Sequence, residues 1–313
     1  MRTLYLADAR MLPRRYIYIK ATVKPFRAVR PVEELAEKIA TLPYDILTEK
    51  ESRKIISENP RSFLRIVRSE AVLPKGTDPY SLEVYKKAKE LLDEDIKTGV
   101  LIEEHKECYY IYRQIMNGRS QTGIVACFSV DDYLNNVIKK HELTRHDKEM
   151  DRTNHIYTCK AQTGLVFMAF QDEYSPEKIM EKVTARDPLY DFTAMDGVRQ
   201  MVWRVDDPIE IEHITACFSL MPALYIADGH HRAASAAAVA KRLRAETPEC
   251  SGTEGFNYMM AVAFPSRELM IYPYNRVMKV LNGMSDEEFL EALPGCGFKV
   301  EKVPASRQSF QKF

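Results

Sequence analysis

The pattern of apolar and polar positions predicts several helices in the first hundred residues. Between residues 78 and 97 apolar side chains recur every three or four positions, as on one face of a helix. Residues 48–58 are expected to form a second helix, because a threonine at the start and Glu51 three positions later make a capping box. A third helix is expected after Pro31, where proline and acidic residues suit a first turn. Residues 62–67 (SFLRIV) instead indicate a strand.

Strands are expected to dominate the middle of the chain. Runs of β-branched and aromatic residues flank Asn117-Gly118 and Asp196-Gly197, dipeptides that favour hairpin turns. Between the two hairpins, residues 139–155 carry dense charge and are expected to form one helix. A short apolar strand at 224–227 leads directly into the sequence DGHHR, and an alanine-rich helix follows as far as Leu243.

The order of these elements predicts an α+β fold, with mixed sheets and flanking helices, because strands and helices do not alternate regularly. Further strands are expected at residues 165–170, 258–264 and 269–274, and a helix and a strand near the end. A length of 313 residues fits two lobes, or one large unit with additions. The best candidate for a boundary divides an N-terminal lobe (1–172) with the charged helix from a C-terminal lobe (173–313) with the DGHHR segment.

Composition gives no support for some classes of partner. The 45 basic residues balance the 45 acidic ones, so net charge gives no reason to expect a nucleic acid. The N-terminal segment lacks the apolar core of a signal peptide, and no run of about 18 apolar residues predicts a membrane span. The six cysteines are scattered, which indicates a reducing compartment rather than a disulfide framework. A cytoplasmic protein is therefore expected.

The DGHHR segment is the strongest candidate for a functional site. A helix that follows a strand directly exposes unpaired backbone N–H groups, which bind anions. Gly229 permits close approach of a ligand or an unusual dihedral, and Asp228 could cap the helix or hold a metal. His230 and His231 titrate near neutrality, and Arg232 offers donors suited to phosphate. The alternative is a polar surface turn with an ordinary aspartate cap.

The charged segment 139–155 invites a zinc interpretation, since His141-Glu142 begins like the motif H-E-x-x-H. The next histidine follows only five positions later, about 140° around a helix, so the zinc-protease interpretation fails. Two alternatives stay open, a solvated helix face with ion pairs and a ligand-binding helix. The candidate ligand-binding residues are Lys140, His141, Thr144, Arg145, Lys148 and Arg152. Arg276 is a lesser candidate, in a segment that could equally be edge packing.

Familiar phosphate-binding and hydrolase motifs are missing from the sequence. It contains no G-x-x-x-x-G-K-[ST], no G-x-G-x-x-G and no G-x-S-x-G. If phosphate chemistry occurs, it therefore uses a less common scaffold.

Taken together, the chain resembles the DUF1015 family of bacterial and archaeal proteins, over residues 24–280. The motifs that carry the resemblance are KPFR at 24–27, LPYD at 42–45, ENP through FL at 58–64, KHExT through KExDR at 140–152, ADGHHR at 227–232 and YPYNR at 272–276. Members of the family usually extend further, so the resemblance implies that the chain, which ends at Phe313, is either naturally short or truncated.

The DGHHR element is also similar to the D-G-H-x-R segment of ParB/sulfiredoxin-like proteins, which include free-serine kinases that make O-phosphoserine. This resemblance implies a small-molecule kinase acting on a hydroxylated metabolite such as free L-serine, with a nucleotide or pyrophosphate as donor. It implies catalytic roles for Asp228 and His230, with Mg²⁺ on Asp228. Arg232, with the amides of Gly229 and His230, would hold phosphate. A unit like that of the ParB/sulfiredoxin proteins is expected within the fold.

A carboxylate elsewhere would then activate the hydroxyl group, and Glu142 and Glu149 are the candidates. Two other functions remain open. One is a nucleotide-binding switch without catalysis, and the other is a phosphatase or hydrolase that uses His230 or His231 as nucleophile or acid. The expected partner in each case is a small molecule, with no nucleic acid and no membrane. The sequence does not define the oligomeric state.

Overall fold

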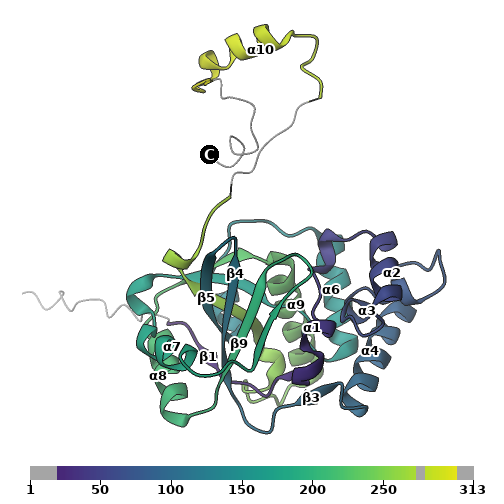
Figure 1. The fold of residues 1–313 in the computed structure, drawn as a ribbon, viewed down its shortest axis with the longest axis vertical. Coiled ribbons are helices and arrows are strands. Elements are labelled where there is room, and N and C mark those ends of the chain that lie inside the picture. The colour runs from purple at the N-terminus through teal and green to yellow at the C-terminus, as the bar shows by residue number, and fades with distance from the viewer. Residues whose placement is uncertain (1–19, 273–278, 302–313) are drawn as a thin grey trace, which may run out of the picture. The chain divides into compact units, whose positions relative to one another are not determined.

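The computed structural model describes residues 20–272 and 279–301, and the chain divides into two compact units between Glu268 and Leu269 (Figure 1). The second unit contains helix α10 (Asp286–Ala292), which begins with a capping box between Ser285 and Glu288. The strand expected at residues 269–274 is not formed at 269–272, and the rest of it lies outside the described residues.

A nine-stranded mixed sheet forms the centre of the first unit. Its strands follow the order β6-β10-β7-β11-β5-β4-β9-β8, and β1 also pairs with β5. These strands are β1 (Val23–Lys24), β4 (Tyr109–Met116), β5 (Arg119–Ser129), β6 (Ile138–Lys139), β7 (Val166–Phe170), β8 (Tyr190–Thr193), β9 (Arg199–Val205), β10 (Leu224–Asp228) and β11 (Tyr258–Pro265). β2 (Val29–Pro31) and β3 (Leu101–Glu103) form a small separate sheet. The boundary expected near residue 172 thus falls within one continuous sheet.

Helices stack outward from this sheet. They are α1 (Ala36–Ile39), α2 (Glu49–Glu58), α3 (Leu64–Val67), α4 (Leu82–Lys97), α5 (Val130–Leu134), α6 (His146–Cys159), α7 (Glu177–Thr184), α8 (Pro208–Phe218) and α9 (His230–Glu246). Helix α9 packs on β7 and β11, α6 packs on α9, and α4 packs on α6 (Figure 1). The buried alanines of α9 allow this close packing on both sides. Among the described residues, no helix combines the length and apolar content that crossing a bilayer requires.

The α+β class and both hairpins are confirmed. Asn117 and Gly118 turn the hairpin of β4 and β5 with positive φ angles, as their sequence predicts. β8 and β9 pair around Gly197, which also has a positive φ. The predicted capping box at Thr48 is present at the start of α2.

Two predictions of local structure are wrong. Residues 62–67 do not form a strand, because Leu64–Val67 is the short helix α3, which is buried on all sides. A short apolar run of this kind gives no periodicity that separates the two structures. Residues 139–155 are not one helix either. Lys139 pairs with β10 as part of β6, residues 140–145 are irregular, and α6 begins only at His146.

Candidate active site

The start of α9 is shaped by Gly229, which lies between β10 and the first helical residue. Its φ of +88° is the unusual dihedral expected for this glycine. A Cβ atom at this position would lie 3.1 Å from Nε and Cζ of Arg232. The Arg232 guanidinium donates hydrogen bonds to the Leu165 carbonyl and, over 2.8 Å, to Oδ2 of Asp228. Asp228 therefore pairs with Arg232, and none of the described side chains caps the helix.

His230 is buried beneath residues 140–145, which we call the 140s loop. Its ring is 3% exposed and lies edge-on to the His141 ring, with centroids 4.4 Å apart. The backbone amide of His141 donates to Nε2 over 3.4 Å, and Nδ1 lies 3.5 Å from Oε2 of Glu142. Burial lowers the pKa of His230, and the neighbouring His141 lowers it further. The neutral ring is therefore favoured.

His231 holds the other end of the 140s loop. Its Nε2 accepts a hydrogen bond of 3.0 Å from the Arg145 amide. Within this region Thr144 donates its hydroxyl to Oε2 of Glu149 over 2.8 Å, and Ser235 of α9 donates to the Glu149 carbonyl. The loop is therefore attached to both α9 and α6, and the two consecutive histidines contact it at different points.

A cavity of about 430 Å³ lies beside His231, and we call it the basic pocket. Its cationic side chains are Arg68, Arg145, Lys148 and Arg152. The LPYD segment contributes Tyr44 and Asp45, and the KExDR segment contributes one face of α6. Three motifs that lie far apart in the sequence therefore converge on a single cavity.

The charges in the basic pocket are only partly balanced. The Arg152 guanidinium lies 4.2 Å above the Tyr44 ring and 2.8 Å from Oδ2 of Asp151, and the Tyr85 hydroxyl donates to the other oxygen of Asp151. Lys148 Nζ lies 3.4 Å from the Tyr80 hydroxyl. Within the part of the chain that the structure describes, Lys148 has no carboxylate at ion-pair distance. Its charge is therefore available to an anionic ligand.

Comparison with known proteins identifies the family of the chain. A family model with the description "Protein of unknown function (DUF1015)" matches residues 23–312. The chain belongs to the DUF1015 family. No curated protein and no solved structure matches it. The family predicted from the motifs is thus confirmed, whereas the likeness to ParB/sulfiredoxin-like proteins stays a prediction.

Seven of the candidate residues of this DUF1015 protein fall into two groups, while the pairs Thr144–Glu149 and Asp228–Arg232 lie outside both. Arg145, Lys148, Arg152 and His231 line the basic pocket. His141, Glu142 and His230 form a separate cluster. Lys140 belongs to neither group, because its ammonium lies 4.1 Å from the centre of the Tyr133 ring. Arg276 lies outside the described residues.

Sequence reasoning missed the aromatic side of the pocket. Tyr44, Tyr80 and Tyr85 line it together with Arg68, and none of them was a candidate. The LPYD motif was the one sequence signal for these tyrosines, and it indicated the family rather than a role for Tyr44 in the pocket. His155 also borders the pocket, but its Nε2 donates to the Ile66 carbonyl and lies 4.0 Å from Sγ of Cys159, and burial lowers its pKa to about 4.

The cluster of His141, Glu142 and His230 has the spacing of a metal site, with one ligand atom of each residue within 4.8 Å of the others. The zinc interpretation was rejected on the assumption of a continuous helix, and that assumption is wrong here because the 140s loop is irregular. Asp228, the predicted Mg²⁺ ligand, is 68% exposed and shares its Oδ2 with Arg232.

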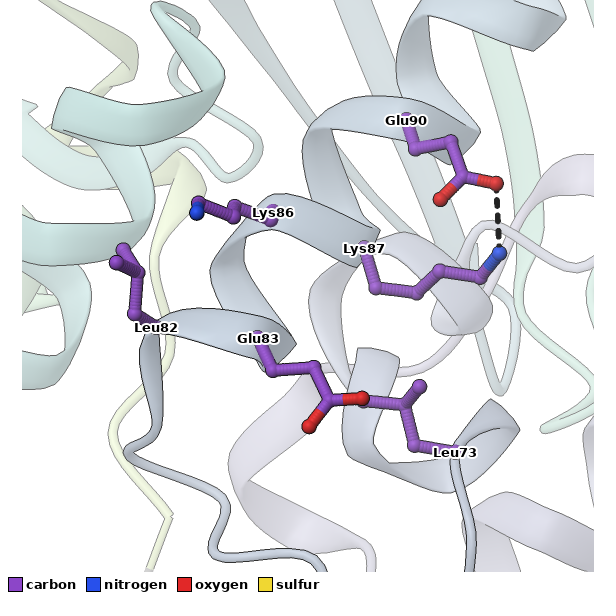
Figure 2. A pocket seen from close by; sticks show the side chains of 6 residues that line it. All are labelled: Leu73, Leu82, Glu83, Lys86, Lys87 and Glu90. Carbon is purple, nitrogen blue, oxygen red and sulfur yellow. Dashed lines mark hydrogen bonds and ion pairs between the residues drawn. The ribbon is translucent and has the colours of Figure 1, made fainter.

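A second hollow of about 440 Å³ runs along α4 and is shown in Figure 2. Its charged residues are Glu83, Lys86, Lys87 and Glu90, and Lys87 forms an ion pair of 2.8 Å with Glu90. Two acids balance two bases, and no histidine borders the hollow. It therefore lacks the excess of cations that distinguishes the basic pocket.

Proposed function

We propose that this DUF1015 protein is a phosphotransferase that acts on a small hydroxylated metabolite such as free L-serine. A nucleotide or pyrophosphate would donate the phosphoryl group. The observation that carries the proposal is the convergence of Arg145, Lys148, Arg152 and His231 on one cavity. Phosphoryl transfer depends mainly on positioned donors and cations around the phosphate oxygens, and this pocket supplies both.

The charge balance supports an anionic ligand. Arg152 is paired with Asp151, and Arg68 is paired with Glu70. Arg145 pairs with the exposed Asp147, a weak partner in water. Lys148 adds a further positive charge close to the first turn of α9, whose amides favour anions. Asp45 also lines the pocket, so four cations face three carboxylates there, and a bound phosphate would offset the remaining positive charge.

Glu142 is the better supported of the two candidate bases. The Glu149 carboxylate already accepts the Thr144 hydroxyl and helps to hold the 140s loop. Glu142 is 60% exposed, and its Oε2 lies 3.5 Å from Nδ1 of His230. In the transfer, the substrate hydroxyl oxygen would bond to phosphorus while the donor's bridging P–O bond breaks. The hydroxyl proton would pass to the Glu142 carboxylate, which lies outside the basic pocket on the same loop as Arg145, a residue that lines it.

Mg²⁺ fits this proposal through the exposed carboxylate of Asp228, since Mg²⁺ prefers oxygen ligands and usually binds through one or two carboxylates and the donor phosphates. Bound there, it would neutralise charge on the donor. Arg232 would then keep Asp228 in place, since it holds the same carboxylate from the first turn of α9.

A nucleotide-binding switch without catalysis is the second candidate, because the basic pocket alone would serve binding equally well. The paired His230 and Glu142 favour an enzyme, since binding requires no acid–base group. A phosphatase with His231 as nucleophile has less support, because Nε2 of this residue accepts the Arg145 amide.

The test is a coupled assay of O-phosphoserine formation from L-serine with ATP, ADP or pyrophosphate in the presence of Mg²⁺. We expect turnover with at least one donor. Calorimetric titration with the same donors runs in parallel. Binding without turnover would favour the switch, and release of phosphate from O-phosphoserine without any donor would favour the phosphatase. A chain that neither binds nor turns over any donor would contradict the proposal.

A further inference from the structure

We propose that His141, Glu142 and His230 form a binding site for a divalent transition-metal ion of the Zn²⁺ type. Each of the three offers one ligand atom, and all three atoms lie within 4.8 Å of one another. Two imidazoles and one carboxylate are a common ligand set for Zn²⁺ and for other first-row metals, with a position left for water or substrate. The site lies outside the basic pocket and does not rest on the proposed function.

The distance between Glu142 and His230 supports ligation. Oε2 of Glu142 lies 3.5 Å from Nδ1 of His230. A charge-assisted hydrogen bond between these groups would be shorter, at about 2.7–2.9 Å. Tetrahedral ligands with bonds of about 2.0–2.1 Å lie roughly 3.3–3.4 Å from one another. The two groups therefore stand at the separation of metal ligands rather than at that of a strong hydrogen bond.

The topology of the sheet brings the ligands together. β6 and β10 are parallel neighbours, with Ile138 opposite Leu224 and Lys139 opposite Tyr225. Chains that leave parallel strands emerge at the same edge of the sheet. The segment after β6 carries His141 and Glu142, and the segment after β10 begins α9 with His230. The ligands are thus provided by a rigid helix and by a loop that is already attached to it.

Metal binding requires the ring hydrogen of His230 to lie on the nitrogen that does not bind the metal. A metal on Nδ1 of neutral His230 leaves the ring hydrogen on Nε2, which faces the His141 amide. That amide contact is 3.4 Å, longer than an ordinary hydrogen bond, so little stabilisation is lost when it opens. The Arg145 amide instead donates to His231. Metal binding should therefore act on the 140s loop first near His141, and the hydrogen bond between the Arg145 amide and His231 can persist.

The donor set also distinguishes this site from the Mg²⁺ expected at Asp228. Imidazole nitrogen suits Zn²⁺, Co²⁺ and related ions, whereas Mg²⁺ prefers an octahedron of oxygen ligands. Glu142 would bind through one carboxylate oxygen and keep the other free.

The experiment uses the whole chain after removal of metals with a chelator. Zn²⁺ stoichiometry is measured by elemental analysis, and affinity by calorimetric titration with Zn²⁺ and by the visible absorption of Co²⁺. His141→Ala and Glu142→Gln remove one exposed ligand each, so the fold should be retained, which thermal unfolding verifies. His213→Ala is the matched control, because His213 is an exposed histidine on α8 next to Glu212, away from the cluster.

We expect one Zn²⁺ per chain in the wild type and in the control, with binding weakened at least about tenfold in both cluster variants. An equal concentration of Mg²⁺ should not displace the ion. Absence of stoichiometric Zn²⁺ binding in the wild type would overturn the proposal. So would unchanged affinity in folded His141→Ala and Glu142→Gln, or displacement by Mg²⁺. Zn²⁺ binding is measured without substrate or donor, so its failure can be told apart from failure of the phosphotransferase assay, in which Glu142→Gln is also expected to lower turnover.

Discussion

Replacement of Gly229 by alanine tests how the start of α9 is built. The backbone at Gly229 has φ = +88°, and the added Cβ would lie 3.1 Å from the Arg232 guanidinium. Two costs are therefore expected. The first is the left-handed conformation, about 1–2 kcal/mol for a residue with a side chain. The second is a shift of the Arg232 guanidinium by a few tenths of an ångström, which strains its hydrogen bonds to the Leu165 carbonyl and Asp228 and costs up to about 1–2 kcal/mol.

Gly76→Ala separates the two costs. Gly76 has nearly the same φ, +89°, but an added Cβ would meet no heavy atom within 4 Å. It should lose only the backbone term, and the gain from a stiffer unfolded chain is equal in both variants and cancels. Urea unfolding should therefore give Gly229→Ala a free energy of unfolding lower than that of Gly76→Ala by up to about 1–2 kcal/mol.

An Arg232→Ala background completes the test as a double-mutant cycle. Without the guanidinium, Gly229→Ala should cost no more than Gly76→Ala, because the second cost has been removed. Equal losses for the two glycine variants in the wild-type background would refute the reasoning. So would an excess at Gly229 that persists after Arg232 is removed.

Three further predictions concern pH, binding and catalysis. Burial raises the pKa of Asp132 to about 6. Between about pH 4 and pH 6 the folded chain therefore keeps a proton that the unfolded chain releases. The free energy of unfolding should fall by up to about 3 kcal/mol over this range. Asp132→Asn should remove this slope in urea titrations across that range, and an unchanged slope would count against burial as its cause. Lys148→Ala should weaken binding of the preferred phosphoryl donor about tenfold in calorimetry, with Lys86→Ala as a matched lysine outside the basic pocket; equal effects would exclude a specific role. Glu142→Gln should lower kcat about 10²- to 10⁴-fold with little change in KM, and a larger loss in Glu149→Gln would reverse the assignment of the base.

Local signals explain which parts of the fold the sequence predicts. Asn117-Gly118 turns a hairpin by its own dihedral preferences, and Thr48 with Glu51 caps α2 without help from distant residues. The 140s loop depends on hydrogen bonds to His230 and His231, almost ninety positions away. No periodicity within a charged segment records such contacts, so the prediction of one helix was wrong there.

In the candidate site too, local sequence signals reveal some residues, whereas others are found only from long-range packing. The DGHHR segment can be recognised as a candidate site from the sequence, because two histidines, an arginine and a glycine are an unusual combination at a strand–helix junction. Tyr44, Tyr80 and Tyr85 give no comparable signal, since tyrosines occur in many cores and surfaces. They meet at one cavity because α4 packs on α6, α6 packs on α9, and the segments that carry Tyr44 and Tyr80 border the same space.

The two histidines at the start of α9 have a thermodynamic consequence. Neighbouring residues on an α-helix point about 100° apart, so His230 and His231 contact different ends of the same loop. Arg145 lines the basic pocket, and the loop that carries it also carries Glu142. If ligands bind at both proposed sites, the two binding equilibria would be linked through this loop. If a ligand in the basic pocket changed the affinity for the metal ion by some factor, the metal ion would change the affinity for that ligand by the same factor.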